Sequence, residues 1–447
     1  MKAKADVVIV GGGPAGIISA LTGKLFYPDK KFLLIRKEEK VIIPCAVPYI
    51  YCSLGTTEKD LISDQILLKK DIEIKVGEVV EVDRENKVCK LKDGNEIEYE
   101  KLVLATGSFP RVPKWLKGAD LENVFTVKKD KKDVDFMLSK LEGCEKIIII
   151  GGGFIGVETS TDLLKKGKKV ILVEKAPQIL TNFDEEFARM AKEELERLGA
   201  EIIVNNGIKE ICGSGKAEYV ILENGEKIEG DTVILAMGYL PNTELARKAG
   251  LEINEFGFIR VDEYMRTSDR EIFAVGDCAE KRNFLTGKPM NLMLASIACL
   301  EARIAGMSLY EISTEKKFEG TLPIISTVVG KSGFGAAGIV ESLALREGFK
   351  IVTGYFETLD KHPGSLANAH KQVVKLIALK DSQVVIGGEV MGGESTGELV
   401  NLIGLIIQNR MSLFDVVHMQ IGTHPMLTSA PTTYPIIRAA QDAISKI

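Results

Sequence analysis

The chain has 447 residues, of which 45% are hydrophobic and 27% charged, and its formal net charge is −5. This length is too great for one hydrophobic core and predicts two or three domains. The acidic balance argues against nucleic acid as the main partner, since it implies no strongly basic face, and no apolar stretch reaches the roughly 18–20 residues of a membrane span. We therefore expect a globular cytoplasmic protein without a nucleic-acid or membrane partner. Lysine pairs such as Lys128-Lys129 are interpreted as solvated surface.

The seven cysteines are an odd number, and none stands in the Cys-x-x-Cys spacing of a metal site. The first six residues lead directly into an apolar strand without the features of a secretory signal. An odd number of cysteines without metal-site spacing and without a secretory signal is typical of reduced thiols in a cytoplasm. We expect no disulfide framework and no metal ligands.

A glycine-rich loop, Gly11-Gly12-Gly13-Pro14-Ala15-Gly16, follows the apolar run Val7–Val10. The pattern predicts a strand over 6–10, a helix over about 14–26 and a parallel strand over 32–35. Glycines at this spacing let the backbone approach a pyrophosphate, whose charge is met by free N–H groups and the helix dipole. A hairpin is expected over 79–91, and a strand over 102–105 ends at Thr106-Gly107.

A second copy begins at 146, where Gly151-Gly152-Gly153-Phe154-Ile155-Gly156 follows Ile147–Ile150. We expect a strand over 170–173, a helix that Asp184 caps and Gly199 ends, and a strand over 232–236 that ends at Met237-Gly238. The prolines between 110 and 113 mark the boundary between the copies. Two dinucleotides bound by one chain indicate that electrons pass between them.

The two copies differ at the end of the strand that follows each loop. In the second copy Glu174 stands there, and its carboxylate can bind both ribose hydroxyls of NAD and repel a 2′-phosphate. NADH is therefore favoured over NADPH, although Lys175 weakens this exclusion and a surface glutamate is the alternative interpretation. In the first copy Arg36 stands there. Glu38 could bind the ribose instead, or Arg36 could stack on or pair with the cofactor.

The paired loops, Ala105-Thr106-Gly107, Gly276-Asp277 and the sequence around Cys45 resemble the flavin-dependent pyridine nucleotide-disulfide oxidoreductases, from Asp6 to about Ala443. The resemblance implies an α/β fold with two Rossmann-like dinucleotide-binding domains and a C-terminal α+β dimerisation domain. The FAD domain is expected over 1–112 and 244–320, the NAD domain over 113–243 and the dimerisation domain over 321–447. It also implies a homodimer whose active site is completed across the interface.

In that family the first copy holds FAD, the second holds NAD(P)H, and the carboxylate equivalent to Asp277 binds the flavin ribitol. A carboxylate at a glycine turn is a good acceptor for such a hydroxyl. The residues assigned to cofactor binding are Gly11, Gly13, Pro14, Ala15, Gly16, Arg36, Lys37, Val79, Ala105, Thr106, Gly107, Arg111, Gly276, Asp277, Ala295, Gly151, Gly153, Phe154, Ile155, Gly156, Glu174 and Gly238.

The stretch from Pro44 to Tyr49 resembles the single-cysteine branch, which contains coenzyme A disulfide reductases, persulfide and polysulfide reductases, and NADH oxidases and peroxidases. Ala46 replaces the glycine that often follows this cysteine. If the segment is helical, Cys52 lies about 10 Å from Cys45, beyond the ~7 Å that a disulfide tolerates. Cys45 is therefore expected to act alone. Pro44 suits a first helical position, and a thiol near a helix N-terminus has a lowered pKa.

The resemblance also bears on the electron acceptor. Pro14 stands where oxidases and peroxidases of this branch carry the histidine that supports a sulfenic acid, which argues against sulfenate chemistry on peroxide or oxygen. Only Lys24 is placed to bind the phosphates of coenzyme A, so this carrier stays open. Glu158, just after the second loop, suits the helix dipole and in the family lies near the nicotinamide and flavin.

Gly422-Thr423-His424-Pro425 resembles the motif in which the partner subunit's histidine protonates a leaving thiolate. His424 is thus a catalytic candidate, with a structural capping role as the alternative, and His362 could line the same pocket.

Cys45, His424 and Glu158 are accordingly the catalytic candidates. The expected function is NADH-dependent flavoprotein reduction of a low-molecular-weight disulfide, persulfide or polysulfide. Two alternatives stay open. One is an NADH oxidase that reduces oxygen, and the other is a redox-sensing flavoprotein that acts through its interactions.

Overall fold

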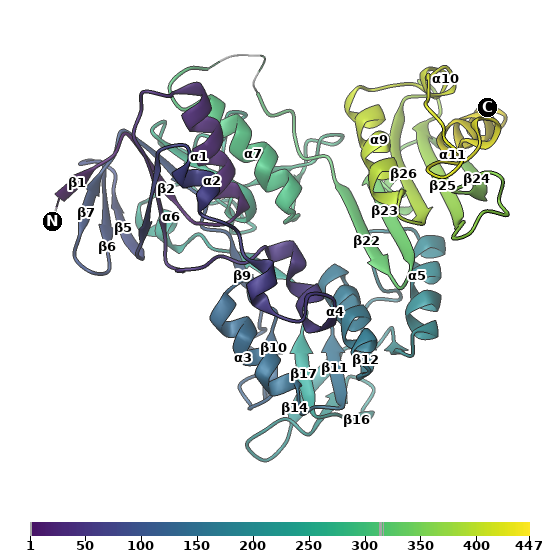
Figure 1. Ribbon diagram of the computed structural model, residues 1–447, viewed down its shortest axis with the longest axis horizontal. Coiled ribbons are helices and arrows are strands. Elements are labelled where there is room, and N and C mark those ends of the chain that lie inside the picture. Colours follow the sequence, from purple (N-terminus) through teal and green to yellow (C-terminus); the bar gives the residue numbers. More distant parts are fainter. Residues whose placement is uncertain (1, 313–314, 316) are drawn as a thin grey trace. The chain divides into compact units, whose positions relative to one another are not determined.

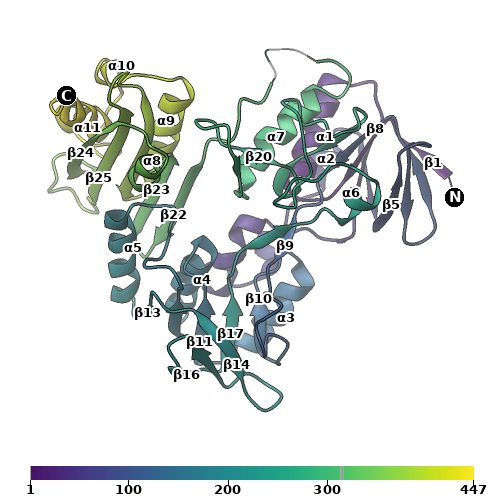
Figure 2. The same ribbon diagram turned by 180° about the vertical axis from the view of Figure 1, so that it is seen from behind.

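The computed structural model describes residues 2–312, 315 and 317–447. Its backbone contacts separate two compact units that the chain enters more than once (Figures 1 and 2). Unit 1 comprises Met1–Pro113, Thr126–Glu142 and Met237–Thr321, and unit 2 comprises Lys114–Phe125, Gly143–Ala236 and Leu322–Ile447.

Unit 1 is built on a five-stranded parallel sheet in the order β19-β8-β2-β3-β4. The strands are β2 (Val7–Val10), β3 (Phe32–Arg36), β4 (Ile72–Val76), β8 (Lys101–Leu104) and β19 (Ile272–Ala274). Their apolar side chains are largely buried, as a parallel sheet covered on both faces requires. Helices α1 (Pro14–Phe26) and α7 (Ala295–Met307) lie side by side, where a Cβ on Gly306 would come within 2.9 Å of the Gly23 nitrogen.

The rest of unit 1 is smaller sheets and short helices. A four-stranded sheet has the order β1-β7-β6-β5, with β1 (Lys2–Lys4), β5 (Val79–Asp83), β6 (Val88–Leu91) and β7 (Glu96–Glu98). Two ribbons pair β9 (Ser108–Pro110) with β18 (Tyr239–Pro241) and β20 (Lys281–Arg282) with β21 (Pro289–Met290). The helical elements are η1 (Pro44–Tyr49), η2 (Ile50–Leu54), η3 (Thr57–Asp60), α2 (Gln65–Leu68), α3 (Lys131–Leu141), α6 (Glu244–Lys248) and η4 (Gly276–Cys278). The predicted 79–91 hairpin is confirmed.

Unit 2 contains the second parallel sheet, in the order β10-β17-β11-β12-β13. Its strands are β10 (Val124–Thr126), β11 (Lys146–Ile150), β12 (Lys169–Val173), β13 (Glu201–Ile203) and β17 (Thr232–Leu235), with α4 (Phe154–Lys165) and α5 (Glu185–Arg197) as its helices. A three-stranded antiparallel sheet adds β14 (Ile208–Cys212), β15 (Tyr219–Leu222) and β16 (Lys227–Glu229). The two predicted βαβ units are therefore present.

The C-terminal part of unit 2 is an α+β module around an antiparallel sheet in the order β22-β23-β26-β25-β24. Its strands are β22 (Ile324–Val329), β23 (Ser332–Gly338), β24 (Ile351–Leu359), β25 (Lys371–Leu379) and β26 (Val385–Gly392). Its helical elements are α8 (Glu341–Arg346), α9 (Thr396–Gln408), α10 (Leu413–Val417), η6 (Pro431–Thr433) and α11 (Pro435–Ile444). In Figure 1, α9 lies beside β23 and β26, and α11 lies beside β24 and β25.

Asp184 is the N-cap residue of α5 but does not cap that helix with its side chain. Its carboxylate instead accepts the backbone N–H groups of Glu341 and Ser342, both at 2.9 Å, at the start of α8. Lys375 on β25 also donates to it at 3.0 Å. The predicted cap is thus correct in position and wrong in target, because two N–H donors and a buried cation attract the carboxylate more strongly than its own helix.

Lys375 is the centre of a buried charge cluster that joins the second βαβ unit to the C-terminal module. Its ammonium lies 2.9 Å from Glu186, 2.6 Å from Glu341 and 3.9 Å from Glu389. Burial and the neighbouring Asp184 carboxylate raise the pKa of Glu389 well above its ordinary value. Burial thus favours the neutral form of Glu389, while the hydrogen bonds to Asp184 and the Lys375 charge lower the pKa of Asp184.

Among the helices of the described residues, none is both long enough and apolar enough to span a membrane.

Candidate functional site

The first glycine loop has a backbone that only glycine can supply at two positions. Gly11 has φ +124°, and a Cβ on it would lie 2.1 Å from the Ala105 carbonyl oxygen. A Cβ on Gly16 would lie 2.0 Å from the Gly11 oxygen, so strand, loop and helix can approach only without side chains. Pro14 is the first residue of α1, as predicted, and Ala15 follows it.

The carboxyl ends of β2 and β8 bring the first loop together with residues far away in the sequence. Ala105 donates its N–H to the Val10 oxygen at 2.9 Å, and a Cβ on Gly276 would lie 2.9 Å from the Ala15 side chain. The loop after β2 lies where the strand order reverses, with β3 on one side and β8 on the other. Ligands of open α/β sheets bind at such switch points.

Open backbone at this edge fits a dinucleotide. A Cβ built on Gly13 or on Gly107 would meet no heavy atom within 4 Å, so both leave space at the loop and at the end of β8. Gly13 precedes the first turn of α1, where backbone N–H groups are unpaired and the helix dipole is positive. Thr106 donates its hydroxyl to the Asn242 oxygen at 2.6 Å, which fixes the turn beside that space.

Asp277 lies in the turn after β19 and is held by two donors. Its Oδ2 accepts from Ser108 Oγ and from Lys129 Nζ, both at 2.7 Å. Burial alone would raise the pKa of Asp277, but the Lys129 charge and the hydrogen bonds from Lys129 and Ser108 hold the pKa below its ordinary value. Lys129 and Ser108 were missed as site residues, and the interpretation of Lys129 as solvated surface is wrong. Lys128 does match it, since its side chain is 50% exposed.

A buried ion pair supports the same turn from within the unit. Glu301 Oε2 accepts the Gly276 N–H at 2.8 Å and lies 3.0 Å from Lys281 Nζ. Lys281 also donates to the carbonyls of Gly276 and Ala279 at 2.7 and 2.9 Å. Both side chains are almost completely buried, so the pair fixes the backbone that carries Asp277.

Arg36 at the end of β3 is engaged by protein groups. Its guanidinium makes a bidentate pair with Asp64, at 2.6 and 2.7 Å, and donates to the carbonyls of Glu38 and Glu39. Its side chain is 4% exposed and covers Gly12, where a Cβ would lie 2.7 Å from Arg36 Cδ. Arg36 therefore shapes the first loop by packing, while its charge is neutralised by Asp64.

The remaining unit 1 residues of the cofactor-binding prediction lie around this edge or on neighbouring elements. Lys37 follows β3 and is exposed, Val79 begins β5, and Ala295 begins α7. Arg111 donates its backbone N–H to the Gly238 oxygen at 2.9 Å, which joins two of the predicted positions. Gly238 has φ +86° with open space above it, like Gly107.

The second glycine loop repeats the geometry of the first. Gly151 has φ +112°, and a Cβ on Gly156 would lie 1.9 Å from the Gly151 oxygen. Gly153 is open, as Gly13 is. Phe154 and Ile155 begin α4, and the Phe154 ring meets Phe183 edge-on at 6.2 Å.

Glu174 closes the second loop with its carboxylate. Oε2 accepts the Gly152 N–H at 2.6 Å, and Oε1 accepts the Ala176 N–H at 2.7 Å. These bonds fix a negative charge beside the loop. Lys175 is directed away, because its ammonium pairs with Glu223 at 2.7 Å. Glu158 on α4 accepts a hydrogen bond from Thr327 of β22 at 2.8 Å, so the C-terminal module fixes it.

Cys45 is the second residue of η1, after Pro44, and its residue surface is exposed. Neither Cys45 nor Cys52 is in a disulfide. The predicted helical segment is a 3₁₀ turn followed by a π turn. The preceding residues are anchored by an antiparallel contact, in which Ile43 donates to the Asp60 oxygen and Ile62 donates to the Val41 oxygen, both at 2.9 Å.

Two histidines of the C-terminal module meet at Thr428. His362 Nδ1 donates to the Thr428 carbonyl at 3.0 Å, which leaves Nε2 of the neutral ring as an acceptor. His424 is exposed, and its Nδ1 accepts the Met426 N–H at 3.2 Å, so its neutral ring carries the proton on Nε2. His424 thus caps a local turn and still presents an N–H donor outward.

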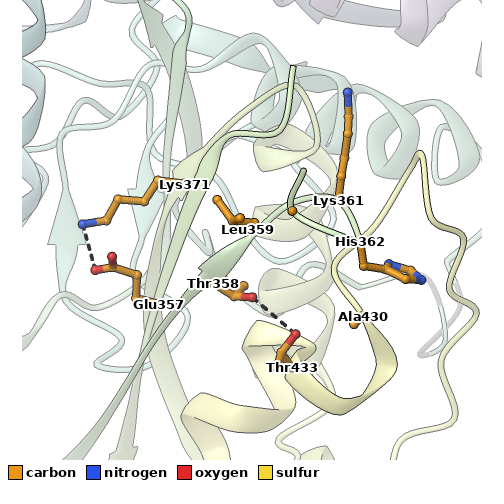
Figure 3. Close-up of a pocket in the computed structure, with 9 residues that line it drawn as sticks. Glu357, Thr358, Leu359, Lys361, His362, Lys371, Ala430 and Thr433 are labelled. Carbon is orange, nitrogen blue, oxygen red and sulfur yellow. Dashed lines mark hydrogen bonds and ion pairs between the residues drawn. The ribbon is translucent and has the colours of Figure 1, made fainter. Parts of the chain in front are cut away.

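His362, but not His424, lines a cavity of about 530 Å³. Figure 3 shows His362 on one side of this cavity and the Glu357–Lys371 ion pair, 2.8 Å long, on the other. Its lining residues are Glu357, Thr358, Leu359, Lys361, His362, Gly364, Lys371, Ala430 and Thr433.

Comparison with known proteins adds family matches over most of the chain. The profile described as pyridine nucleotide-disulphide oxidoreductase matches residues 5–302, and the profile of that family's dimerisation domain matches residues 324–435. An NADH oxidase of Methanocaldococcus jannaschii is 33% identical over 98% of this chain and 99% of its own length. A coenzyme A-dependent NAD(P)H sulfur oxidoreductase of Pyrococcus abyssi is 32% identical over 88% of this chain and 89% of its own.

Among solved structures, an NAD-dependent persulfide reductase from A. fulgidus superposes with a TM-score of 0.91. It is 27% identical, and the match covers all of this chain and 83% of the other.

Proposed function

Because the chain belongs to the pyridine nucleotide-disulphide oxidoreductase family, we propose that it is an NADH-dependent reductase of a low-molecular-weight disulfide, persulfide or polysulfide that works through Cys45. The family assigns FAD and a nicotinamide dinucleotide as cofactors. The observation that carries the proposal is Cys45 itself: an exposed thiol on an anchored turn, directly after Pro44.

The residues of unit 1 would hold FAD, with the pyrophosphate at Gly11–Gly16 and the ribitol at Asp277. When bound, FAD accepts a hydride from NADH and delivers an electron pair to sulfur. In unit 2, the loop Gly151–Gly156 would hold NADH, with Glu174 on the ribose. The fixed carboxylate and the diversion of Lys175 to Glu223 support NADH over NADPH.

The chemistry at sulfur follows from thiolate exchange. The Cys45 thiolate attacks one sulfur of a disulfide, which forms a mixed disulfide and releases the first thiolate. The electron pair that originates from NADH then cleaves this S–S bond, releases the second thiolate and restores Cys45. With a persulfide the sulfur released is sulfide. Each leaving thiolate takes up one proton.

His424 is our candidate for that proton. The donor would be the imidazolium form of this exposed ring, since a neutral imidazole does not protonate a thiolate, and the residue lies in the region that the dimerisation profile matches. We propose a homodimer in which the partner subunit's His424 faces the thiol.

Lys24 is the candidate for binding the phosphates of coenzyme A, but its ammonium donates to the carbonyls of Pro28 and Lys30 at 2.8 and 3.0 Å. That engagement favours carriers without these phosphates.

An NADH oxidase is the second candidate, because the Methanocaldococcus jannaschii relative of that name is 33% identical over nearly the full length. Pro14 argues against sulfenate chemistry, since its side chain cannot hydrogen-bond to a sulfenic acid. Oxygen reduction that needs no thiol would survive the loss of Cys45.

The test is NADH oxidation by the FAD-loaded protein without oxygen, with coenzyme A persulfide, coenzyme A disulfide or inorganic polysulfide as acceptor. Cys45→Ser is compared with wild type, and Cys52→Ser is the matched control. We expect turnover that Cys45→Ser lowers at least about 10³-fold and Cys52→Ser leaves within about threefold. Turnover that is equal in wild type and Cys45→Ser, and that rises in air, would establish the oxidase instead.

A further inference from the structure

Lys129 lies outside both glycine loops, yet it contacts the carboxylate that the proposed function places at the flavin. The Lys129 ammonium donates to Asp277 Oδ2 at 2.7 Å and to Ser108 Oγ at 2.8 Å. It also lies 4.5 Å from the centre of the Tyr239 ring, in cation–π geometry. Three elements of unit 1 therefore fix the ammonium.

The surroundings of Asp277 leave Lys129 as its compensating charge. Lys281 also lowers the pKa of Asp277, but less than Lys129 and Ser108 do, and its ammonium is paired with Glu301 at 2.9 Å. Tyr239 donates its hydroxyl to the Val127 oxygen at 2.6 Å, away from the carboxylate. Among the residues that the structure describes, Lys129 is thus the cation whose hydrogen bond ends on Asp277.

The arrangement also leaves one carboxylate oxygen for a ligand. Both donors, Ser108 and Lys129, use Oδ2 of Asp277. Oδ1 is the acceptor that remains on a side chain with 14% of its surface exposed. A ribitol hydroxyl donates one hydrogen bond, and an ionised carboxylate accepts it more strongly than a neutral carboxyl does.

We propose that Lys129 is a positioning residue for FAD: it orients Asp277 and keeps its carboxylate charged, so that Oδ1 can accept a flavin hydroxyl. The inference rests on the proposed function only in placing FAD at unit 1. The proposed role of Lys129 is to act through Asp277 on the affinity for FAD, and it does not involve the sulfur substrate.

The role predicts a pH dependence with a definite sign. Without the Lys129 charge, the low-dielectric surroundings favour the neutral form of Asp277. The variant must then lose a proton from Asp277 to bind FAD well, so its affinity falls as the pH falls. The groups that face Asp277 are Lys129, Ser108 and Tyr239 from one side and the neutralised Lys281–Glu301 pair from the other.

The experiment is titration of cofactor-free protein with FAD, followed by flavin fluorescence, at pH 5 and pH 8. Lys129→Met is expected to bind FAD more weakly than wild type at pH 8, and its FAD affinity should fall about a further tenfold at pH 5. The FAD affinity of wild type should change by less than about threefold between the two pH values. Lys129→Arg keeps the positive charge and should therefore bind FAD as wild type does, with the same flat pH profile. Lys128→Met is the matched control, because Lys128 is exposed and pairs with Asp133 at 2.8 Å.

Asp277→Asn supplies the decisive second comparison. If Lys129 acts through Asp277, then in the Asp277→Asn background Lys129→Met should add no pH dependence. Lys129→Gln repeats the test without charge but with a donor, in case Lys129→Met does not fold. Equal FAD affinity and pH profile in wild type, Lys129→Met and Lys129→Gln would overturn the inference. Wild type that binds no FAD at either pH would instead overturn the proposed function.

Discussion

The two glycine loops have nearly the same backbone and opposite charges beside them. A Cβ on Gly16 or on Gly156 would lie 2.0 or 1.9 Å from the carbonyl oxygen five residues earlier. The strand after the first loop ends at Arg36, which Asp64 neutralises. The strand after the second loop is followed directly by Glu174, which is bonded to the loop itself. Phosphate binding therefore dictates the backbone, and the strand end is free to differ.

This difference separates what a glycine loop recognises from what discriminates between cofactors. The loop N–H groups and helix start suit any pyrophosphate. Glu174 adds a fixed negative charge, whereas the Arg36–Asp64 pair adds none. Substitutions at the loops should therefore abolish binding, and substitutions at the strand ends should change stability or selectivity.

Gly16→Ala and Gly156→Ala should have the largest effects. The added methyl meets a backbone oxygen that cannot move without shifting a strand, so each variant should lose at least about 100-fold in affinity for its own dinucleotide. We expect Gly16→Ala to lose FAD and Gly156→Ala to lose NADH, measured by flavin fluorescence and by NADH titration. Gly13→Leu and Gly153→Leu are the controls for folding. A Cβ at either position meets no heavy atom within 4 Å, so these variants should still fold. If both variants lost affinity for the same dinucleotide, the assignment of FAD to the first loop and NADH to the second would be contradicted.

Asp64→Ala should have the next largest effect, on stability. The Arg36 guanidinium would stay buried with two carbonyls but without its counter-ion, which costs about 2–4 kcal/mol in the free energy of unfolding. Urea unfolding measures it. Glu78→Ala is the control, because the Lys92–Glu78 pair is exposed and such pairs contribute about 0–1 kcal/mol. A loss for Asp64→Ala no larger than for Glu78→Ala would show that Arg36 needs no counter-ion.

The sequence predicted the loops, the strands that precede them and the Glu174 position, because their determinants are local. Apolar runs end at glycines whose spacing a phosphate requires, and these features lie within a few residues of one another. The fold class followed from finding that unit twice. The cap at Asp184 was predicted in position for the same local reason.

What the sequence did not predict are contacts between distant segments. Lys129 and Asp277 are 148 positions apart, and Arg36 and Asp64 are 28 apart. A lysine in a charged run has the same pattern whether it meets water or a buried carboxylate. The target of Asp184 was missed because it lies on α8, more than 150 residues away. Long-range charge pairing is set by tertiary packing, which periodicity does not encode.

Asp60 extends the comparison of the loops to a carboxyl for which the described part of the chain shows no ion pair. It lies on the segment that also carries Asp64, is 1% exposed, and its carboxylate oxygens have no hydrogen-bond partner among the described residues. Burial raises the pKa of Asp60 to about 6, above the 3.8 of an unperturbed side chain. The folded protein therefore favours the neutral form of Asp60. The stability that this neutral form provides is fully present below about pH 4 and is lost as the pH rises through 6.

Asp60→Asn removes this titration and should stabilise the protein at pH 8 by about 2 kcal/mol relative to pH 4.5. Urea unfolding at the two pH values measures the difference. Asp29→Asn, at an exposed position, is the control. A variant whose advantage over wild type does not grow with pH would show that Asp60 is compensated in the folded protein.

Glu174→Gln should have the smallest effect and bears most directly on selectivity. The amide oxygen can accept from only one of Gly152 and Ala176, so the substitution removes the negative charge and one of the two bonds to the loop. NADH affinity should fall about tenfold, since a neutral oxygen accepts ribose hydroxyls less strongly, and NADPH should lose less because the repulsion of its 2′-phosphate is gone. Glu223→Ala makes the converse change: it frees Lys175 and should raise NADPH affinity without altering NADH affinity. If Glu174→Gln weakens both nucleotides equally, Glu174 acts only as a loop brace, and the discrimination lies elsewhere in the second site.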